Sequence, residues 1–191
     1  MKSVSMIAAV CIGLVASTVL AKDDKDDDKI RAKLTGKQEV PYVSTPGSGT
    51  FVAEALANGD IHYELTYSGL QADVTQAHIH IGQRGANGAI AIWLCGSATI
   101  PVPPGAATQP NNCPLRAGTI TGTITAASIR PIAAQGIAAN ELAEVEAAMR
   151  AGFAYANVHT TLSPGGEIRG QLRSRNTRGD DDGKGGGDHK H

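Results

Sequence analysis

Three histidines lie in two segments whose residue pattern is typical of β-strands, and the segments are far apart along the chain. His78 and His80 are separated by one residue in Ala-His-Ile-His-Ile, and His159 closes the run Tyr-Ala-Asn-Val-His. Because successive side chains of a strand point to opposite faces, His78 and His80 share one face, and His159 shares a face with Asn157. If the two strands are neighbours, three imidazole rings converge.

Three converging imidazoles suit a metal ion, since imidazole nitrogen is a good ligand for Cu(II) and Zn(II). Three protein ligands also leave an open coordination position, which a catalytic or redox metal requires. We therefore expect a metal site, copper before zinc, with His78, His80 and His159 as ligands. The groups expected to support these ligands in a second shell are Asn157, Glu167 and Arg169.

The same residues also fit a site without metal. A histidine on a strand often only forms a hydrogen bond to a backbone carbonyl or a carboxylate. In this alternative the three histidines belong to a buried polar network with Asn157, Glu167 and Arg169, and the protein is a binding or structural module without catalysis. His62 alternates onto the outer face of its strand and is expected to be solvated.

Other kinds of active site find little support. The glycine-rich segment 82–88 follows a strand, but another strand pattern comes next, so the helix N-terminus of a phosphate-binding loop is missing. The sequence contains no Gly-x-Ser-x-Gly motif and no P-loop. The 17 basic and 18 acidic residues form no obvious basic cluster, so a nucleic-acid partner is not expected, whereas a protein or glycan partner stays open.

The two ends of the chain differ from the part between them. Residues 1–21 have a lysine, an apolar run and Val-Leu-Ala before the expected cut, as in a secretory signal peptide. Residues 22–29 read as a charged linker, and residues 173–191 as a disordered tail rich in Gly, Asp, Lys and His. The mature protein is thus expected in the periplasm or outside the cell, with no membrane span after cleavage.

Cleavage after residue 21 would remove Cys11 and leave Cys95 and Cys113. In an oxidising compartment such a pair most often forms a disulfide. This bond would close the proline-bearing segment between the two cysteines and contribute about 3 kcal/mol.

Residues 30–172 have the pattern of one all-β domain, with short alternating runs separated by turn signals. We expect an antiparallel β-sandwich of Greek-key character with one short helix over residues 140–150. Asn140 is predicted to cap this helix and Gly152 to end it. The predicted strands cover residues 30–34, 49–57, 60–68, 75–81, 89–94, 118–125, 153–159 and 167–172.

Over residues 30–172 the sequence resembles the CHRD domain family, named for its occurrence in the animal protein chordin. The matching segments include Leu-Thr-Gly-Lys-Gln-Glu-Val-Pro near the start, Ala-His-Ile-His-Ile-Gly, and Gly-Gly-Glu-Ile-Arg-Gly-Gln-Leu at the end. The three histidines fall at positions of the family pattern, and the resemblance therefore implies a shared site there. It also implies an extracellular type of domain.

A weaker likeness connects the pattern to Cu/Zn superoxide dismutase, which is also an all-β sandwich with a His-x-His copper pair and an arginine near its C-terminus. Arg169 would stand for that arginine. Zinc-loop ligands and a bridging histidine are missing between His80 and His159. A non-enzymatic role is therefore favoured, and any enzyme here would be a copper-dependent oxidoreductase of the superoxide-dismutase type.

Overall fold

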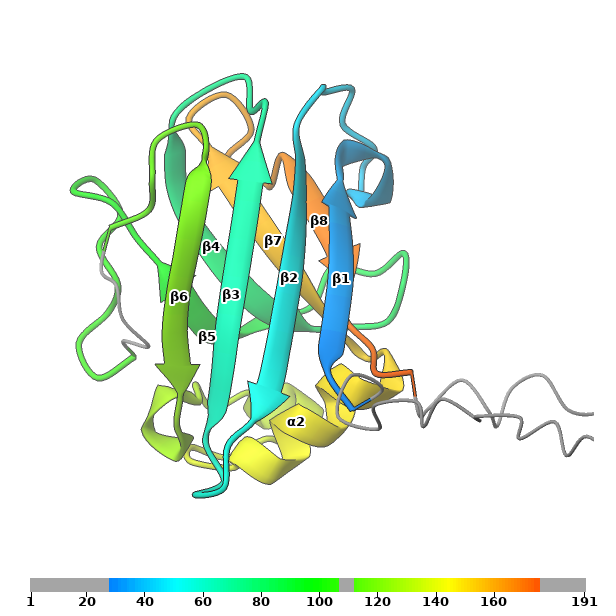
Figure 1. Cartoon of the computed structure of the whole chain (residues 1–191), viewed down its shortest axis with the longest axis vertical. Coiled ribbons are helices and arrows are strands. Elements are labelled where there is room, and N and C mark those ends of the chain that lie inside the picture. The colour runs from blue at the N-terminus through cyan, green and yellow to red at the C-terminus, as the bar shows by residue number, and fades with distance from the viewer. Residues whose placement is uncertain (1–27, 107–111, 176–191) are drawn as a thin grey trace, which may run out of the picture.

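The computed structural model describes residues 28–106 and 112–175 (Figure 1). The predicted signal peptide, nearly all of the predicted linker and most of the predicted tail lie outside these residues, as do the tail histidines, so those predictions remain predictions. Within the described part, no helix has the length and apolar character needed to cross a membrane.

Eight strands form one antiparallel sheet in the order β5-β4-β7-β8-β1-β2-β3-β6, which confirms the all-β prediction. Most strand ends agree with the predicted ranges to within two residues, and the Asn58-Gly59 turn joins β2 to β3 as expected. The strands are β1 (Ile30–Thr35), β2 (Ser48–Ala55), β3 (Ile61–Ser68), β4 (Val74–Ile81), β5 (Ala89–Cys95), β6 (Gly118–Ile124), β7 (Ala154–Thr160) and β8 (Ile168–Gln171).

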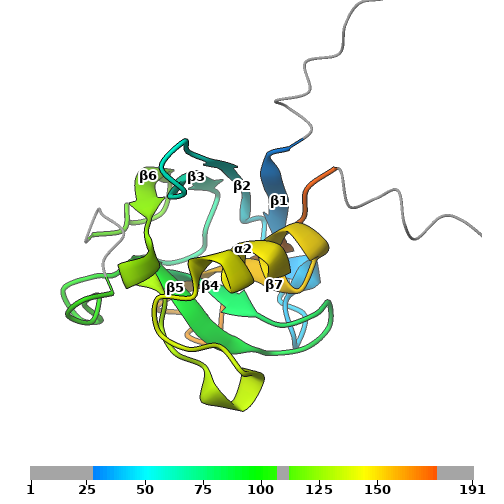
Figure 2. The ribbon, with the colours of Figure 1, turned by 90° about the horizontal axis from the view of Figure 1, so that it is seen from below.

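The sheet folds over into two layers, as Figures 1 and 2 show. β1, β2, β3 and β6 form the front layer of Figure 1, and β4, β5, β7 and β8 form the layer behind it. The β8–β1 pairing joins the layers along one side. Three connections, β3 to β4, β5 to β6 and β6 to β7, pass from one layer to the other, so strands that follow each other in sequence are not always sheet neighbours.

The core lies between the layers, and β3 shows how alternating side chains build it. In β3, Ile61, Tyr63 and Leu65 are fully buried, whereas His62 and Glu64 between them are exposed, as the sequence predicts. Each of the two buried β3 tyrosines donates a hydrogen bond from its hydroxyl to a backbone carbonyl of another segment. Tyr63 donates to Leu94 at 3.0 Å, and Tyr67 donates to Pro114 at 2.6 Å. Thus the core aromatics also connect the layers.

The α-helix of the described residues, α2 (Leu142–Ala151), covers the lower end of the sandwich and packs against β4 and β7 (Figure 2). It ends as predicted, because Gly152 adopts the left-handed conformation with φ 85°. The predicted start was wrong. Asn140 has φ 67° and stands before the N-cap residue Glu141, whose carboxylate accepts the backbone N–H of Ala138 at 2.6 Å. Three short 3₁₀ turns, which the sequence did not predict, are Gly36–Gln38, Ala126–Ser128 and Ala133–Gln135.

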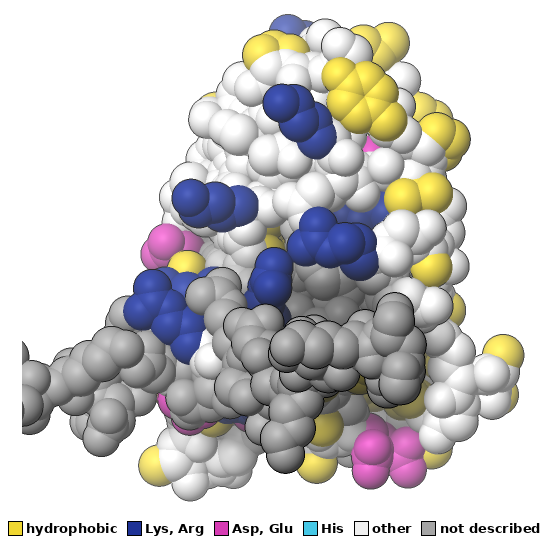
Figure 3. All heavy atoms as spheres, turned by 90° about the vertical axis from the view of Figure 1, so that its right-hand side faces the viewer, with side chains coloured by type: hydrophobic (Ala, Val, Ile, Leu, Met, Phe, Trp, Pro, Cys, Tyr) yellow, Lys and Arg dark blue, Asp and Glu magenta, His cyan; other side chains and the backbone are white. Residues whose placement is uncertain are grey.

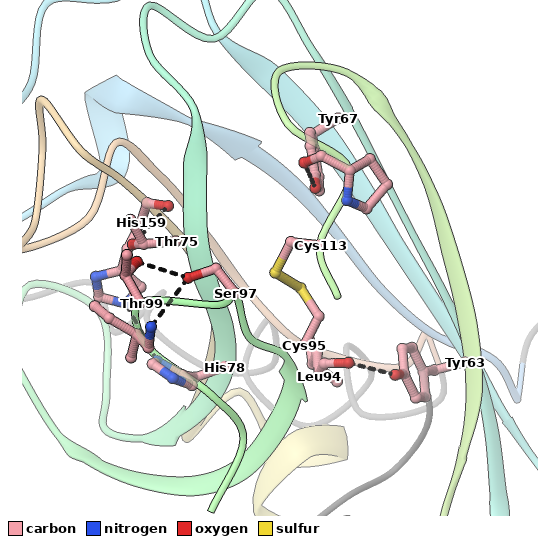
Figure 4. The surroundings of a disulfide bond; sticks show 12 residues. Tyr63, Tyr67, Thr75, His78, Leu94, Cys95, Ser97, Thr99, Cys113 and His159 are labelled. Atoms are coloured by element: carbon pink, nitrogen blue, oxygen red, sulfur yellow. Dashed lines mark hydrogen bonds between the residues drawn. A yellow bond between two sulfur atoms is a disulfide. The ribbon is translucent and has the colours of Figure 1, made fainter. Parts of the chain in front are cut away.

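The predicted disulfide is present. Cys95 at the end of β5 is bonded to Cys113, 18 residues further along the chain, with a Cα–Cα distance of 5.2 Å. Figure 4 places this bond between the layers, close to the contacts of Tyr63 and Tyr67, with His78 and His159 off to the other side of the β4 ribbon.

Replacing both Cys95 and Cys113 with serine should lower the free energy of unfolding by about 3 kcal/mol, because the unfolded chain regains the freedom of that loop. Urea unfolding of the two forms measures this difference. A loss below about 1 kcal/mol would show that the disulfide adds little to the stability of the sandwich.

Candidate metal centre

β4 and β7 lie side by side, and this pairing brings the three histidines together. His78 pairs with Asn157, His80 with Tyr155, and Gln76 with His159. The residues between them on β4, such as Ile79, face the core. The histidines therefore lie on the outer face of the back layer, opposite the core, and yet their exposed fractions are only 0% for His78, 8% for His80 and 7% for His159.

Strand β5 adds a tryptophan to this face through two irregularities in its pairing. The register with β4 shifts between Ala77 and His78 and again between Ile79 and His80, so that His78 lies opposite Trp93. Bulges of this kind redirect side chains and are frequent near functional sites. The indole ring meets the imidazole of His78 edge-on, with 4.2 Å between ring centroids.

The ligand nitrogens of the three histidines all lie within 4.8 Å of one another. Nδ1 of His78 and Nε2 of His159 lie 3.2 Å apart, within hydrogen-bond distance. Two nitrogens bound to one ion at about 2.0 Å each are no more than about 4 Å apart. Side-chain shifts below about 1 Å would therefore bring all three nitrogens into ligand distance.

Backbone carbonyls decide which ring nitrogens carry protons. Nδ1 of His80 donates to the carbonyl of Gly88 at 3.0 Å, and Nδ1 of His159 donates to the carbonyl of Pro164 at 3.0 Å. In the neutral rings, Nε2 of each is then an unprotonated acceptor. Among the described residues, Nε2 of His78 and Nε2 of His80 are buried and have no hydrogen-bond partner.

Burial keeps these rings neutral. It lowers the pKa of His78 to about 2, with His159 and His80 adding to the effect, and it lowers the pKa of His80 to about 4 against the opposing hydrogen bond to Gly88. The pKa of His159 is also lowered, again mainly by burial. Neutral imidazole is the form that binds metal ions.

These shifts predict acid sensitivity of the metal-free protein. When the pKa of a histidine is lower in the folded than in the unfolded chain, falling pH protonates the unfolded chain first and so favours it. The free energy of unfolding is therefore undiminished above pH 6.5 and decreases as the pH falls from 6.5 toward the folded pKa. Between pH 7 and 5, His80 alone should cost about 2 kcal/mol of unfolding free energy. His80→Gln should remove this part of the pH dependence in urea unfolding. The matched control is the same change at the exposed His62, and an equal effect of both changes would contradict the prediction.

The segment 82–88 covers the site and is anchored there. Gly88 accepts a hydrogen bond from His80 and donates its N–H to the hydroxyl of Tyr155 at 3.1 Å. A Cβ at Gly88 would collide with the carbonyl oxygen of Ile81, so this position needs glycine. The glycine-rich segment thus shields imidazoles, and the element directly after it is strand β5 and not a helix.

Comparison with known families identifies the domain. The model of the CHRD domain matches residues 30–172, which include all three histidines and every strand. The chain belongs to the CHRD domain family. No curated protein and no solved structure matches the chain.

A stack of three side chains links the histidines of the CHRD domain to a buried ion pair. The ring of Tyr155 stacks on His80 with 4.8 Å between centroids and 2° between planes, and the guanidinium of Arg169 lies 4.3 Å from the Tyr155 centroid on β8's side of the sheet. Arg169 also forms an ion pair with Glu39 at 3.3 Å. Arg169 is therefore placed behind Tyr155, where it lowers the pKa of His80 and His159.

Glu39 is the centre of that ion-pair network in the CHRD domain. It is 5% exposed, accepts a hydrogen bond from the side-chain amide of Asn157 at 2.6 Å, and forms an ion pair with Arg169. Burial raises the pKa of Glu39 to about 7, against the lowering effect of Arg169. Arg169 also donates to the carbonyl of Ala86 and to the side chain of Asn87, which fixes the covering segment.

Glu167 belongs to a different network of the CHRD domain. Its carboxylate accepts hydrogen bonds from the hydroxyl of Thr45 at 2.6 Å, from the backbone of Gln71 at 2.9 Å and from the hydroxyl of Thr160 at 2.8 Å. These hydrogen bonds connect the segments of Thr45, Gln71 and Thr160 at one end of the sandwich. The structure thus places Asn157 and Arg169 beside the histidine cluster, where Glu39 contacts both of them and Tyr155 lies between Arg169 and His80. Glu167 belongs to a separate network.

Glu39, Trp93 and Tyr155 are the neighbours of the site that the sequence did not indicate. Glu39 belongs to the Glu-Val-Pro motif, so the sequence marked the residue as part of the family pattern. Nothing in the sequence indicated that Glu39 is buried. Tyr155 lies on the same face of its strand as Asn157 and His159, so the alternation of side chains could have predicted its place beside the site. The place of Trp93 could not be predicted in this way, because it depends on the bulges of β5.

Proposed function

We propose that this CHRD domain binds a single metal ion, copper before zinc, through His78, His80 and His159. The observation that carries the proposal is the pair of buried Nε2 atoms of His78 and His80, which have no partner among the described residues. Leaving such atoms unsatisfied costs about 1–3 kcal/mol each, and a metal ion would remove that cost.

The hydrogen bonds behind the rings support the proposal. Metal-binding histidines almost always donate their second ring nitrogen to a carbonyl or carboxylate, which orients the ring. His80 does so to Gly88 and His159 does so to Pro164. Copper is favoured over zinc because nitrogen sites bind Cu(II) more tightly.

Burial favours a retained ion over a rapidly exchanging catalytic one. His78 has an exposed fraction of 0%, and Trp93 and Tyr155 pack against the imidazoles. When bound, copper would supply Lewis acidity and one-electron redox chemistry. The chain's own part would be to hold the ion, orient its ligands and keep water away, so storage or structural use of the metal is preferred to turnover of superoxide.

We infer that the protein works outside the cytoplasm. The Cys95–Cys113 disulfide is compatible with an oxidising compartment. The signal-peptide pattern of residues 1–21 supports the same setting.

A second candidate function is supported by the contacts between the rings. The 3.2 Å approach of His78 to His159 is a good hydrogen bond, and the nearby Arg169–Glu39 pair is fully enclosed. In this alternative the histidines stabilise the covering segments, and the domain is a binding or structural module without metal.

Calorimetric titration with Cu(II) and Zn(II) decides between these functions. The chain should carry His189→Ala and His191→Ala, because tail histidines bind metal weakly by themselves. We expect one Cu(II) per chain, bound more tightly than Zn(II), and no such binding after His78, His80 and His159 are all changed to alanine. Equal heats for both forms would rule out the metal site and leave the structural network.

A further inference from the structure

A groove of about 480 Å³ lies beside β1, and its lining holds six basic side chains and no acidic one. Figure 3 shows Lys and Arg side chains gathered on this face. Because the whole chain is nearly balanced, with 17 basic and 18 acidic residues, folding creates this concentration of charge from separate parts of the sequence. The six are Lys29, Arg31, Lys33, Arg84, Arg173 and Arg175.

The stability of the sheet does not account for this arrangement. Arg31 lies directly opposite Arg173 in a β-bridge closed by backbone hydrogen bonds of 2.9 and 3.2 Å, and Lys33 is the next outward residue of β1. Like charges opposite each other destabilise a sheet. At the rim, Lys29 is paired with Glu54 at 3.3 Å, but Lys33, Arg84 and Arg173 take part in no ion pair within the described part of the chain.

We propose that this groove binds an acidic polysaccharide, through sulfate or carboxylate groups spaced along a flexible chain. Guanidinium groups bind such oxyanions through paired hydrogen bonds, and lysine adds a point charge. The basic groups of the groove come from three separate parts of the chain, namely β1 with the residue before it, the segment 82–88 and the residues after β8, so the groove offers several anion-binding groups at once. The exposed hydroxyl of Thr50 can bond to sugar hydroxyls.

The lining favours a polysaccharide over a nucleic acid. Proteins that bind single strands stack bases on aromatic rings. Phe51 is the aromatic residue of this lining, and its side chain is 0% exposed because it belongs to the core. The proposal does not depend on a metal at the histidines, since none of the three lines the groove.

The test is binding of fluorescently labelled dextran sulfate and polygalacturonate to the full chain, at low and at physiological salt. Binding should weaken as salt rises. Lys33→Glu with Arg173→Glu should weaken it by at least about tenfold. The matched control is Arg116→Glu with Arg130→Glu, which makes the same change of charge on exposed residues outside the groove and should cost less than about threefold. Circular dichroism checks that both variants are folded.

Three kinds of result would overturn the proposal. The first is that the groove does not account for binding, either because the intact chain does not bind or because the two variants lose affinity equally. The second is tighter binding of a single-stranded oligonucleotide than of dextran sulfate. The third is binding that appears only after Asp23, Asp24, Asp26 and Asp27 are changed to asparagine, because the groove would then serve the chain's own acidic segment.

Discussion

Replacing His159 with alanine should weaken Cu(II) binding by at least about 100-fold, because loss of a direct ligand exceeds the 10- to 100-fold cost of losing an outer partner of a ligand. His159 is the residue to choose, since it alone comes from β7 and joins the two strands of the site. Its removal also takes away the acceptor of His78 at 3.2 Å. Competition with a chromophoric chelator measures the affinity.

The control for His159→Ala is His62→Ala. His62 lies on the exposed face of β3, so its loss removes an imidazole without touching the site, and the Cu(II) affinity should stay within about twofold. If His62→Ala and His159→Ala had the same effect, copper would be bound at the surface and the three-histidine site would be wrong.

Replacing Arg169 with methionine should lower the free energy of unfolding by about 3–5 kcal/mol, the cost of leaving a buried charge without its partner. The side chains of Arg169 and Glu39 are 4% and 2% exposed. The change also removes the hydrogen bonds to Ala86 and Asn87, which hold the segment above the histidines. Urea unfolding at pH 7 measures the loss.

Arg116→Met provides the matched comparison for Arg169→Met. Arg116 pairs with Asp73 at 2.7 Å, but both side chains are about half exposed, at 62% and 46%. Exposed pairs contribute about 0.2–1 kcal/mol, so the loss should be small. Similar losses in the two variants would show that the Arg169–Glu39 pair does not stabilise the domain. Adding Glu39→Gln to Arg169→Met should restore part of the stability, because the unpaired charge is then gone.

Much of the fold and of the histidine cluster follows from local patterns. Alternation in β3 predicted the buried Tyr63 and the exposed His62, and the Asn58-Gly59 pair predicted its hairpin. The spacing of His78 and His80 placed both on one face. That they meet His159 depended on one further fact, the β4–β7 pairing, which the structure confirms.

The remaining features depend on contacts between distant segments. Trp93 reaches His78 only because β5 shifts register twice, and no local signal marks a bulge there. Glu39 accepts a hydrogen bond from Arg169, which lies 130 residues away. The helix begins after Asn140 because that residue takes φ 67°, which overrides its preference for the cap position.

X-ray absorption of the chain loaded with one Cu(II), with His189 and His191 replaced by alanine, tests the three-histidine site most directly. We expect a shell of imidazole nitrogens at about 2.0 Å, three per copper, that falls to two in His159→Ala. An imidazole shell that stays the same when His78, His80 and His159 are all replaced by alanine would contradict it, because copper would then be bound elsewhere on the chain.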